Sequence, residues 1–172
     1  LHWDMATMMP IKSRKHRADQ LALMAKFKHG LLSSQKVNDL IKETNEDYLD
    51  SKDKVNFQEM KREHLLTSSL PADLVEAFSK ASAKCEGVWQ EARKDCSFKT
   101  VEKSLNELIN LTIQESEILS EKFKCSKYES LIQKYEPLAS LNHISNVFKD
   151  LKLFLVKSVD DIIEKQKKDT FL

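Results

Sequence analysis

The sequence predicts an all-α fold without a β-sheet, in which about six to seven antiparallel helices surround a central helix near residues 71–94. Two observations carry this prediction. Only 2 glycines and 3 prolines occur among 172 residues, so the chain has few of the residues that end helices or form tight turns. Apolar residues recur at steps of three and four along most of the chain, and no segment shows the alternation typical of a strand.

The most regular of these patterns predicts the central helix, in the stretch LPADLVEAFSKASAKCEGVWQEAR at 70–93. Pro71 suits the first turn, where its missing N–H has no partner to lose, and Glu76 and Lys80 are spaced as an i,i+4 ion pair. Because the stripe is broad, we expect helices to pack on it from more than one side and Trp89 to lie in the core. Truncating Trp89 to alanine would then cost about 3–5 kcal/mol. The stripe consists of Leu74, Val75, Phe78, Ala81, Ser82, Cys85, Val88, Trp89 and Ala92.

The chain begins with a segment that has no clear period, residues 1–12, followed by the first expected helix. Ser13 is the candidate N-cap of this helix, and Gly30 stands where a left-handed residue would end it. Its apolar stripe is Ala18, Leu21, Ala22 and Ala25. The segment before it is too apolar for a free tail, so we expect its large side chains to be packed; these are Trp3, Met5, Met8 and Met9.

Two further helices are expected before the central one. The second starts at Ser33 or Ser34 and ends near Asn45, and the third covers about residues 52–67. Each has a recognisable apolar face, although many charges interrupt the third. These faces are Val37, Leu40, Ile41 and Thr44 on the second helix, and Phe57, Met60, His64 and Leu65 on the third.

Three helices are expected after the central one. Ser97 caps the first of them, which ends near Cys125; a short helix at about 127–135 is closed by Pro137, and Ser140 caps the last. The apolar positions of the two long helices follow seven-residue rhythms. They are Val101, Leu105, Leu108, Ile109, Thr112, Leu119 and Phe123 in one, and Ile144, Phe148, Leu151, Leu155 and Ile162 in the other.

Length and charge favour one domain over residues 1–172 and exclude several classes of protein. A chain of this length can bury roughly 70% of its unfolded surface. A net charge of +1, from 28 basic and 27 acidic residues, gives no general attraction to nucleic acid or to anionic membranes. No transmembrane or signal segment is recognisable. Three cysteines without a CxxC motif favour a reduced, cytoplasmic location.

Metal and nucleophilic chemistry find little support in the residues. No two of the five histidines lie three or four positions apart, so HExxH is absent. A zinc site built from His64, His143 and Cys85 across helices is an alternative, against structural histidines. Cys85 lies on the buried stripe, where a thiol is an inert apolar group, whereas Cys125 is expected to be more exposed but has no recognisable partner base.

Two charged clusters have a structural and a functional interpretation. Three carboxylates suggest a di-iron bundle, but the required Glu-x-x-His pairs are missing, which favours a solvated acidic face. They are Glu115, Glu117 and Glu121. The lysines within Lys165–Lys168 suggest a basic patch, but they also oppose the helix dipole, and Asp161–Lys165 and Glu164–Lys168 have ion-pair spacing, which favours a solvated helix end.

The most function-like cluster is the HWD tripeptide at the N-terminus. His2, Trp3 and Asp4 combine the residue types that line substrate grooves. The alternative is an N-terminal anchor that plugs the core. The residues alone leave both interpretations open.

Five segments together resemble the M32 family of zinc metallocarboxypeptidases, the carboxypeptidase Taq type. The resemblance covers nearly the whole chain, and the order and spacing of the segments are similar to the family's throughout. The segments are LHWDMATMMP at 1–10, RADQLALMA at 17–25, LPADLVEAFSKASAKCEGVWQEAR at 70–93, YESLIQKYEP at 128–137 and NVFKDLKLFL at 146–155.

The resemblance implies an all-α fold in which N-terminal helices form one wall and a cap over a groove that holds the catalytic zinc. It also implies an enzyme that removes residues one at a time from the C-terminus of peptides, often as a homodimer. His2, Trp3 and Asp4 are then candidates for residues near the groove.

The departures from the family pattern limit what the chain does alone. It looks like roughly the first third of a family member: a lead-in helix before HWD is missing, and the chain stops before HExxH, the downstream Glu ligand and the Arg-containing substrate motifs. No zinc ligand or catalytic Glu of the family maps onto this chain, so we expect no cofactor bound by it. Leu138 follows YEP where the family usually has Gly, so the turn there is expected to differ.

Two main hypotheses follow. The chain is the N-terminal fragment of a zinc carboxypeptidase, inactive alone, whose partners are the missing catalytic part and a second copy. Alternatively, it is a stand-alone helical interaction module; a chance match to an unrelated bundle is a third possibility. Under the first hypothesis, helices that lack their remainder should leave a large apolar patch and promote self-association or partner binding.

Overall fold

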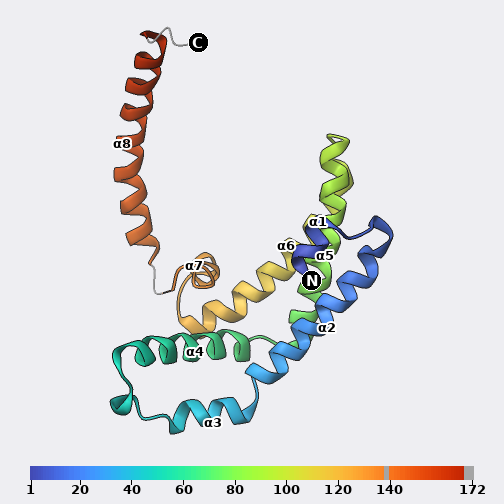
Figure 1. Ribbon diagram of the computed structural model, residues 1–172, viewed down its shortest axis with the longest axis vertical. Helices are drawn as coiled ribbons and strands as arrows, with labels where there is room; N and C mark the ends of the chain where they lie inside the picture. Colours follow the sequence, from blue (N-terminus) through green and yellow to red (C-terminus); the bar gives the residue numbers. More distant parts are fainter. Residues whose placement is uncertain (138–139, 169–172) are drawn as a thin grey trace. The chain divides into compact units, whose positions relative to one another are not determined.

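Most of the part of the chain that the structure describes is helical. A computed structural model describes residues 1–137 and 140–168, with side chains up to residue 167. Within these ranges there are eight α-helices, two short 3-10 helices and no strand, which confirms the all-α prediction (Figure 1). In chain order they are α1 (His2–Thr7), η1 (Ile11–Ser13), α2 (Arg14–Leu32), α3 (Gln35–Glu43), η2 (Glu46–Tyr48), α4 (Ser51–Ser69), α5 (Ala72–Lys94), α6 (Phe98–Phe123), α7 (Lys127–Ile132) and α8 (Leu141–Lys168).

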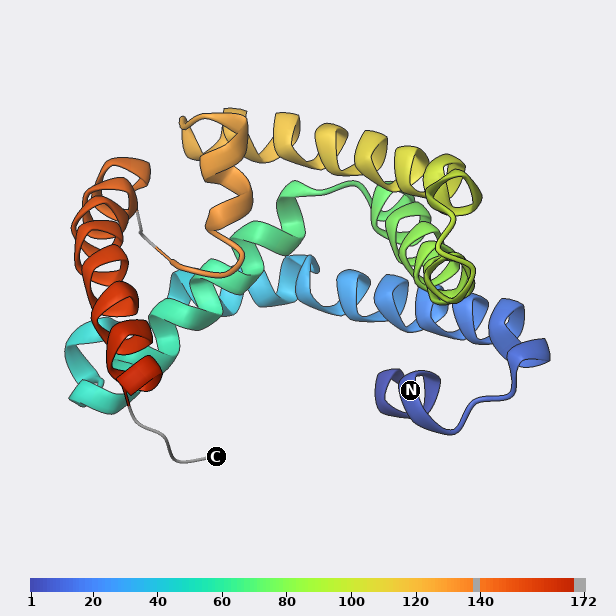
Figure 2. The ribbon, with the colours of Figure 1, turned by 90° about the horizontal axis from the view of Figure 1, so that it is seen from above.

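Two compact units make up the chain, Leu1–Lys127 and Tyr128–Leu172. In the first unit, α5 is the central helix and packs against both α2 and α6. Figure 2, in which α5 is seen nearly end-on, shows α2 (blue) and α6 (yellow) on opposite sides of it. The broad stripe of α5 therefore packs against helices from two sides, as its width predicts.

The core of the first unit forms where α5 meets α6. Cys85 and Ala92 of α5 are buried with Val101 of α6. Three half-buried side chains, Val88, Leu105 and Leu108, enclose this cluster. On the other side of α5, Leu21 and Ala22 of α2 are buried, at 7% and 1% exposure. Cys85 is thus a buried free thiol, as predicted.

Trp89 does not lie in this core, and the prediction that it does is wrong. Its side chain is 47% exposed, and the Arg93 guanidinium lies 5.5 Å from the ring centre. The periodicity places Trp89 at the edge of the stripe, where neither α2 nor α6 covers the whole ring.

We therefore expect Trp89→Ala to cost about 1–2 kcal/mol, because only about half of the ring area is removed from water. Urea denaturation of the purified chain measures this difference. Phe98→Ala is the control, since Phe98 is 66% exposed and should cost less. A loss above about 3 kcal/mol for Trp89→Ala would restore the original core assignment.

The structure confirms some of the predicted helix ends and changes others. Gly30 does not end the first helix, because α2 continues to Leu32 and Gly30 has no positive φ. Ser34, rather than Ser33, caps α3 by accepting a hydrogen bond from the Val37 N–H. Ser13 and Ser97 occupy N-cap positions, although neither side chain makes the capping bond. Asn45 is the N-cap of η2 and follows Thr44, which is the C-cap of α3.

The N-terminal segment forms a helix, α1, for which the sequence has no clear period. This raises the number of α-helices above the expected six to seven. Met5 and Met9 are half-buried, in keeping with the expected packing. Trp3 and Met8 are exposed at 73% and 71%, so the expectation that they pack is wrong for these two side chains.

In the second unit, α7 is followed by the long α8. Ser140 caps α8 as predicted, because its Oγ accepts a hydrogen bond from the His143 N–H at 3.2 Å. The Glu129 carboxylate accepts a second one, from the Leu141 N–H at 3.2 Å, and ties α7 to the start of α8. The predictions for the turn at Leu138 and for the side-chain pair Glu164–Lys168 lie outside the described residues.

No helix in the described ranges combines the length and the apolar character needed to cross a membrane.

Candidate functional site

The HWD tripeptide forms the first turn of α1. His2 and Trp3 are exposed, whereas Asp4 is half-buried. Successive residues of a helix point roughly 100° apart, so the three side chains do not share one face. The Trp3 carbonyl accepts a hydrogen bond from the Thr7 hydroxyl at 2.7 Å, and the Met8 and Met9 N–H groups bond to the Asp4 carbonyl.

Asp4 fixes α1 on the rest of the first unit. Its carboxylate forms an ion pair with the Arg17 guanidinium of α2, and the Arg17 side chain is 17% exposed. This contact holds one residue of the tripeptide on α2, whereas the other two are exposed. Sequence reasoning proposed the three residues but gave no sign of Arg17 as their partner, because the two are joined only through the fold.

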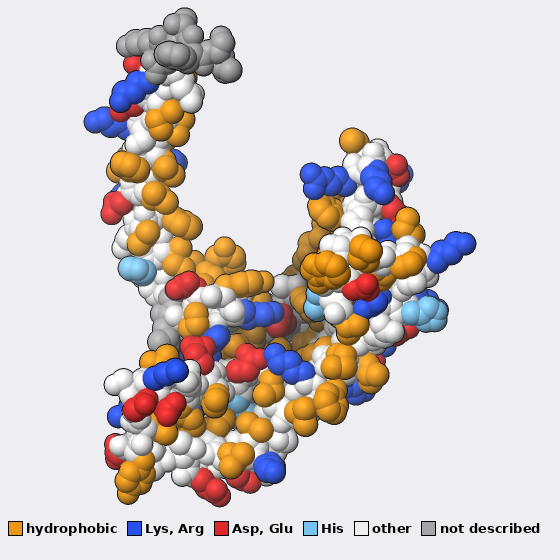
Figure 3. Space-filling view, viewed as in Figure 1, with side chains coloured by type: hydrophobic (Ala, Val, Ile, Leu, Met, Phe, Trp, Pro, Cys, Tyr) orange, Lys and Arg blue, Asp and Glu red, His pale blue; other side chains and the backbone are white. Residues whose placement is uncertain are grey.

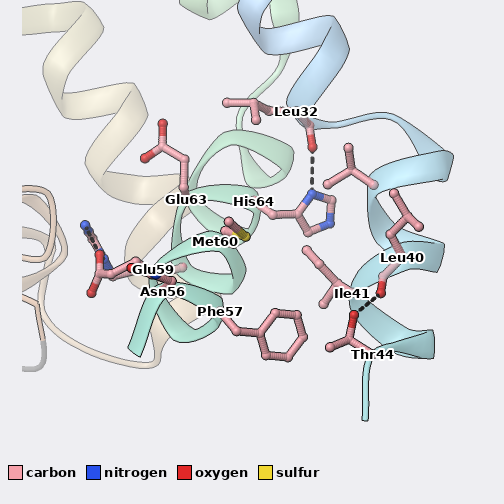
Figure 4. A pocket seen from close by; sticks show the side chains of 12 residues that line it. Leu32, Leu40, Ile41, Thr44, Asn56, Phe57, Glu59, Met60, Glu63 and His64 are labelled. Carbon is pink, nitrogen blue, oxygen red and sulfur yellow. Dashed lines mark hydrogen bonds and ion pairs between the residues drawn. The ribbon is translucent and has the colours of Figure 1, made fainter. Parts of the chain in front are cut away.

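A second candidate site is a groove between α3 and α4, with a volume of about 640 Å³ (Figure 4). The apolar faces predicted for these helices line it, with Leu32 of α2 at one end. Phe57 is 7% exposed, but Leu40 and Met60 are 54% and 62% exposed, so the two helices leave part of their apolar faces open. The sequence predicted both faces but not that a space would remain between them.

Polar groups of α4 border this groove. The His64 Nδ1 lies 2.7 Å from the Leu32 carbonyl oxygen and donates to it, which orients the ring between α2 and α3. Glu59 pairs with Arg62 at 2.8 Å on the same helix. The volume of the groove, about 640 Å³, falls in the range of ligand pockets, which are usually apolar with a few polar groups.

Two of the five histidines, His29 and His64, bond through their rings to backbone carbonyl groups. His29 is buried, and its Nε2 lies 2.7 Å from the Leu70 carbonyl oxygen, which ties the end of α2 to the turn before α5. His64 is engaged with Leu32, and Cys85 lies in the apolar core. Within residues 1–137 and 140–167, no group of three or more His, Cys, Asp or Glu side chains is placed to hold a metal ion. Of the alternative set of His64, His143 and Cys85, the first unit contains His64 and Cys85, and both have structural surroundings.

The acidic cluster of α6 is not uniformly solvated, which corrects that expectation. Glu115 is buried at 6% exposure, whereas Glu117 and Glu121 are exposed. Glu117 forms an ion pair with Lys127 at 2.6 Å. Its position one helical turn before the fully buried Leu119 turns Glu115 toward the same inner face.

A charge cluster joins α2 to α5. The Glu76 carboxylate lies 2.8 Å from the Lys80 Nζ, which confirms the predicted pair, and 2.9 Å from the Lys26 Nζ. Hydrogen bonds from Lys80 and then from Lys26 lower the pKa of Glu76 from its ordinary value of 4.5 to about 2. The sequence predicted the Glu76–Lys80 pair from its spacing but not the contact of Glu76 with Lys26.

The lowered pKa of Glu76 predicts a pH-dependent contribution to stability. The contribution is fully present above about pH 4.5 and is lost as the pH falls toward about 2, because the unfolded chain then binds the proton first. Glu76→Gln should therefore destabilise the chain slightly at pH 7 and not below pH 2, and high salt should shrink the difference. Unfolding curves across this pH range test it, with the exposed Glu102→Gln as the control. An equal effect at all pH values would contradict it.

Comparisons with known proteins identify relatives of the chain. It is 25% identical over 173 residues to thermostable carboxypeptidase 1 of Thermus thermophilus, a match that covers 94% of this chain and 34% of that protein. Trypanosoma cruzi metallocarboxypeptidase 1 matches in structure with a TM-score of 0.77 and 28% identity, covering 97% of this chain and 34% of that one. The crystal structure titled BsuCP shares the fold, with a TM-score of 0.79 at 22% identity over 88% of this chain and 30% of that one.

The chain thus spans about a third of the length of these relatives. The model of one protein family, described as carboxypeptidase Taq (M32) metallopeptidase, matches residues 1–172. Its match extends over the whole sequence, including the HWD segment, the central helix and the last helix. The chain therefore belongs to the carboxypeptidase Taq (M32) metallopeptidase family.

Proposed function

We propose that this chain is the N-terminal part of a zinc-dependent metallocarboxypeptidase, which removes residues from the C-terminus of peptides. The observation that carries the proposal is the family match over all 172 residues, combined with coverage of only about a third of the relatives. Residues 1–172 then form one helical domain that supplies a wall or cap of the substrate groove. Its partner is the catalytic part, and the assembled enzyme forms a homodimer in the cytoplasm.

The requirements of zinc-dependent peptide hydrolysis indicate which part of the enzyme supplies the catalytic groups. The metal needs side-chain ligands and an open coordination position, where it activates water and polarises the scissile carbonyl. HExxH, which supplies two ligands and a general base, does not occur in this sequence. The zinc ligands therefore belong to the part of the enzyme that this chain does not span, and this chain contributes shape and peptide contacts.

Within the wall, we assign His2 and Trp3 to the groove surface and Asp4 to the anchor that holds α1. Trp3 is 73% exposed in the first unit, and an exposed Trp offers a large apolar face with an indole N–H, which suits contact with a peptide. The Asp4–Arg17 ion pair keeps α1 on α2, so the two outward side chains are presented from a fixed base.

The test is complementation. The chain alone should release no C-terminal residue from peptides, with or without Zn²⁺ or Co²⁺. Co-expression with the two-thirds of the Thermus thermophilus relative outside the match should yield metal-dependent release. Within that complex, Trp3→Ala should raise KM, whereas Met8→Ala, at a similarly exposed position of the same segment, should not.

Three results would contradict the proposal. Metal-dependent carboxypeptidase activity from the isolated, contaminant-free chain would move the catalytic residues into it. A co-purified complex without activity would favour an interaction module. Equal KM values for Trp3→Ala and Met8→Ala would remove Trp3 from the groove.

A further inference from the structure

The last helix, α8, has a wide apolar surface that its own unit leaves open. None of its described side chains is buried. Figure 3, in the orientation of Figure 1, shows hydrophobic side chains along much of this upright helix. The largest are Phe148 and Phe154, at 63% and 66% exposure, and Leu151, Leu155 and Ile162 are exposed at 43%, 45% and 54%. These exposures are far above those of a helix packed in a core.

The width of this surface indicates how many neighbours it needs. At roughly 100° per residue, Phe154 and Val156 lie about 200° apart around α8, with Leu155 midway between them. The other apolar residues except Leu153 fall within the same arc, here called the α8 arc. Its polar interruptions are Ser145, Lys152, Ser158, Lys165 and Gln166. A helix on the surface of a globular protein shows an apolar stripe of about 100° or slightly more. The α8 arc is therefore wide enough for packing against helices on two sides.

A second copy of α8 is a poor occupant for this arc. Two paired helices bury only the a and d positions of a heptad, a narrower seam than the α8 arc. In the register of Phe148, Leu151, Leu155 and Ile162, the remaining seam positions toward the C-terminal end are Ser158 and Lys165. A polar and a charged residue there would be buried in a symmetric pair, while Phe154 and Val156 at the edges of the arc would stay exposed.

The share of a relative that this chain matches indicates what packs on the α8 arc. The match to the Trypanosoma cruzi enzyme covers 97% of this chain, so the unmatched residues are far fewer than the 28 of α8, and most of this helix has a counterpart there. The same match covers 34% of that enzyme, which leaves about two-thirds of a protein to pack around the counterpart. A body of that size can cover a helix from two sides.

We propose that the α8 arc is the docking surface for the other two-thirds of the carboxypeptidase, and that α8 is buried between helices of that part. This inference rests on the proposed function, since it names the surface through which the catalytic part is held. Burial of apolar side chains along this helix of 28 residues then drives assembly. Docking through α8 also attaches the first unit, which contributes the groove wall, to the catalytic part.

Two leucines of α8 provide a matched test. The neighbours of Leu151 at i±3 and i±4 are all apolar: Phe148, Val147, Phe154 and Leu155. Leu153 lies roughly 160° from the middle of the α8 arc, and its corresponding neighbours include the charged Lys149, Asp150 and Lys157. Both leucines are exposed in the second unit, so lysine at either position should leave the helix content of the free chain unchanged.

The experiment co-expresses the tagged full chain with the two-thirds of the Thermus thermophilus relative outside the match. The unaltered chain and Leu153→Lys should retain that partner equally. Leu151→Lys should retain at least about tenfold less, because a charge would be buried in an apolar interface. Hydrogen exchange of α8 should be slow in the complex and fast in the free chain.

The outcomes separate this inference from the proposed function. Retention with the expected Leu151 and Leu153 difference but without activity supports the docking surface and contradicts the function. Activity that is indifferent to Leu151→Lys overturns the docking surface alone. Failure of the unaltered chain to retain the partner also overturns it, as does a homodimer of the free chain that Leu151→Lys dissolves and Leu153→Lys does not.

Discussion

Replacing Leu119 by alanine is expected to lower the free energy of unfolding of this chain by about 3–5 kcal/mol. Leu119 is 0% exposed and is the largest fully buried side chain within the described residues. Its truncation removes apolar contacts and leaves a cavity that the neighbouring side chains can only partly fill. Because domains of this size are stable by about 5–15 kcal/mol, this loss is a large share of the total.

The control lies six residues earlier on the same helix. Ile113 is 45% exposed, so Ile113→Ala should cost about 1 kcal/mol or less. Urea denaturation of both variants, with helix content followed by circular dichroism, measures the difference. Equal losses for Leu119→Ala and Ile113→Ala would mean that α6 does not bury the face on which Leu119 lies.

The second large effect is expected where α2 crosses α5. A Cβ atom on Gly87 would lie 3.1 Å from the Cδ of Arg14, and the Arg14 side chain bonds to Glu91 and Gln90 of α5. Gly87→Leu should therefore displace Arg14, break these bonds and cost about 1–3 kcal/mol through overpacking. The higher helix propensity of leucine offsets only part of this loss.

The only other glycine of the sequence is the matched control for this substitution. Gly30 also lies within an α-helix, but a Cβ atom there meets no heavy atom within 4 Å. Gly30→Leu should therefore stabilise the chain by about 0.5–1 kcal/mol through helix propensity alone. Thermal denaturation of both variants separates the two effects. Stabilisation of similar size at both positions would show that Arg14 yields without loss.

The sequence alone determined the elements that depend on local pattern. The spacing of apolar residues predicted seven of the eight α-helices of the described chain and identified α5 as the central one. Ser34 and Ser140 were recognised as caps because a cap needs only a hydroxyl a few residues before the N–H that it binds. The order of five segments also indicated the family, since a resemblance between sequences can be recognised without knowing how the helices pack.

The candidate site depended more heavily on the fold. The sequence proposed His2, Trp3 and Asp4, but it did not reveal that Arg17 holds Asp4 while Trp3 remains exposed. It predicted the apolar faces of α3 and α4 but not the groove between them. In each case the missing information was the distance between elements, which depends on side chains far apart in the chain.

Tertiary structure alone decided how far each apolar face is covered. Trp89 and Cys85 share the stripe of α5, yet Cys85 is buried and Trp89 is 47% exposed. The neighbouring helices bury Cys85 but cover only part of the Trp89 ring. Periodicity fixes the direction in which a side chain points from its own helix, at about 100° per residue. The periodicity of one helix does not show where the facing helix begins, ends or crosses it. That geometry determines which apolar side chains become buried.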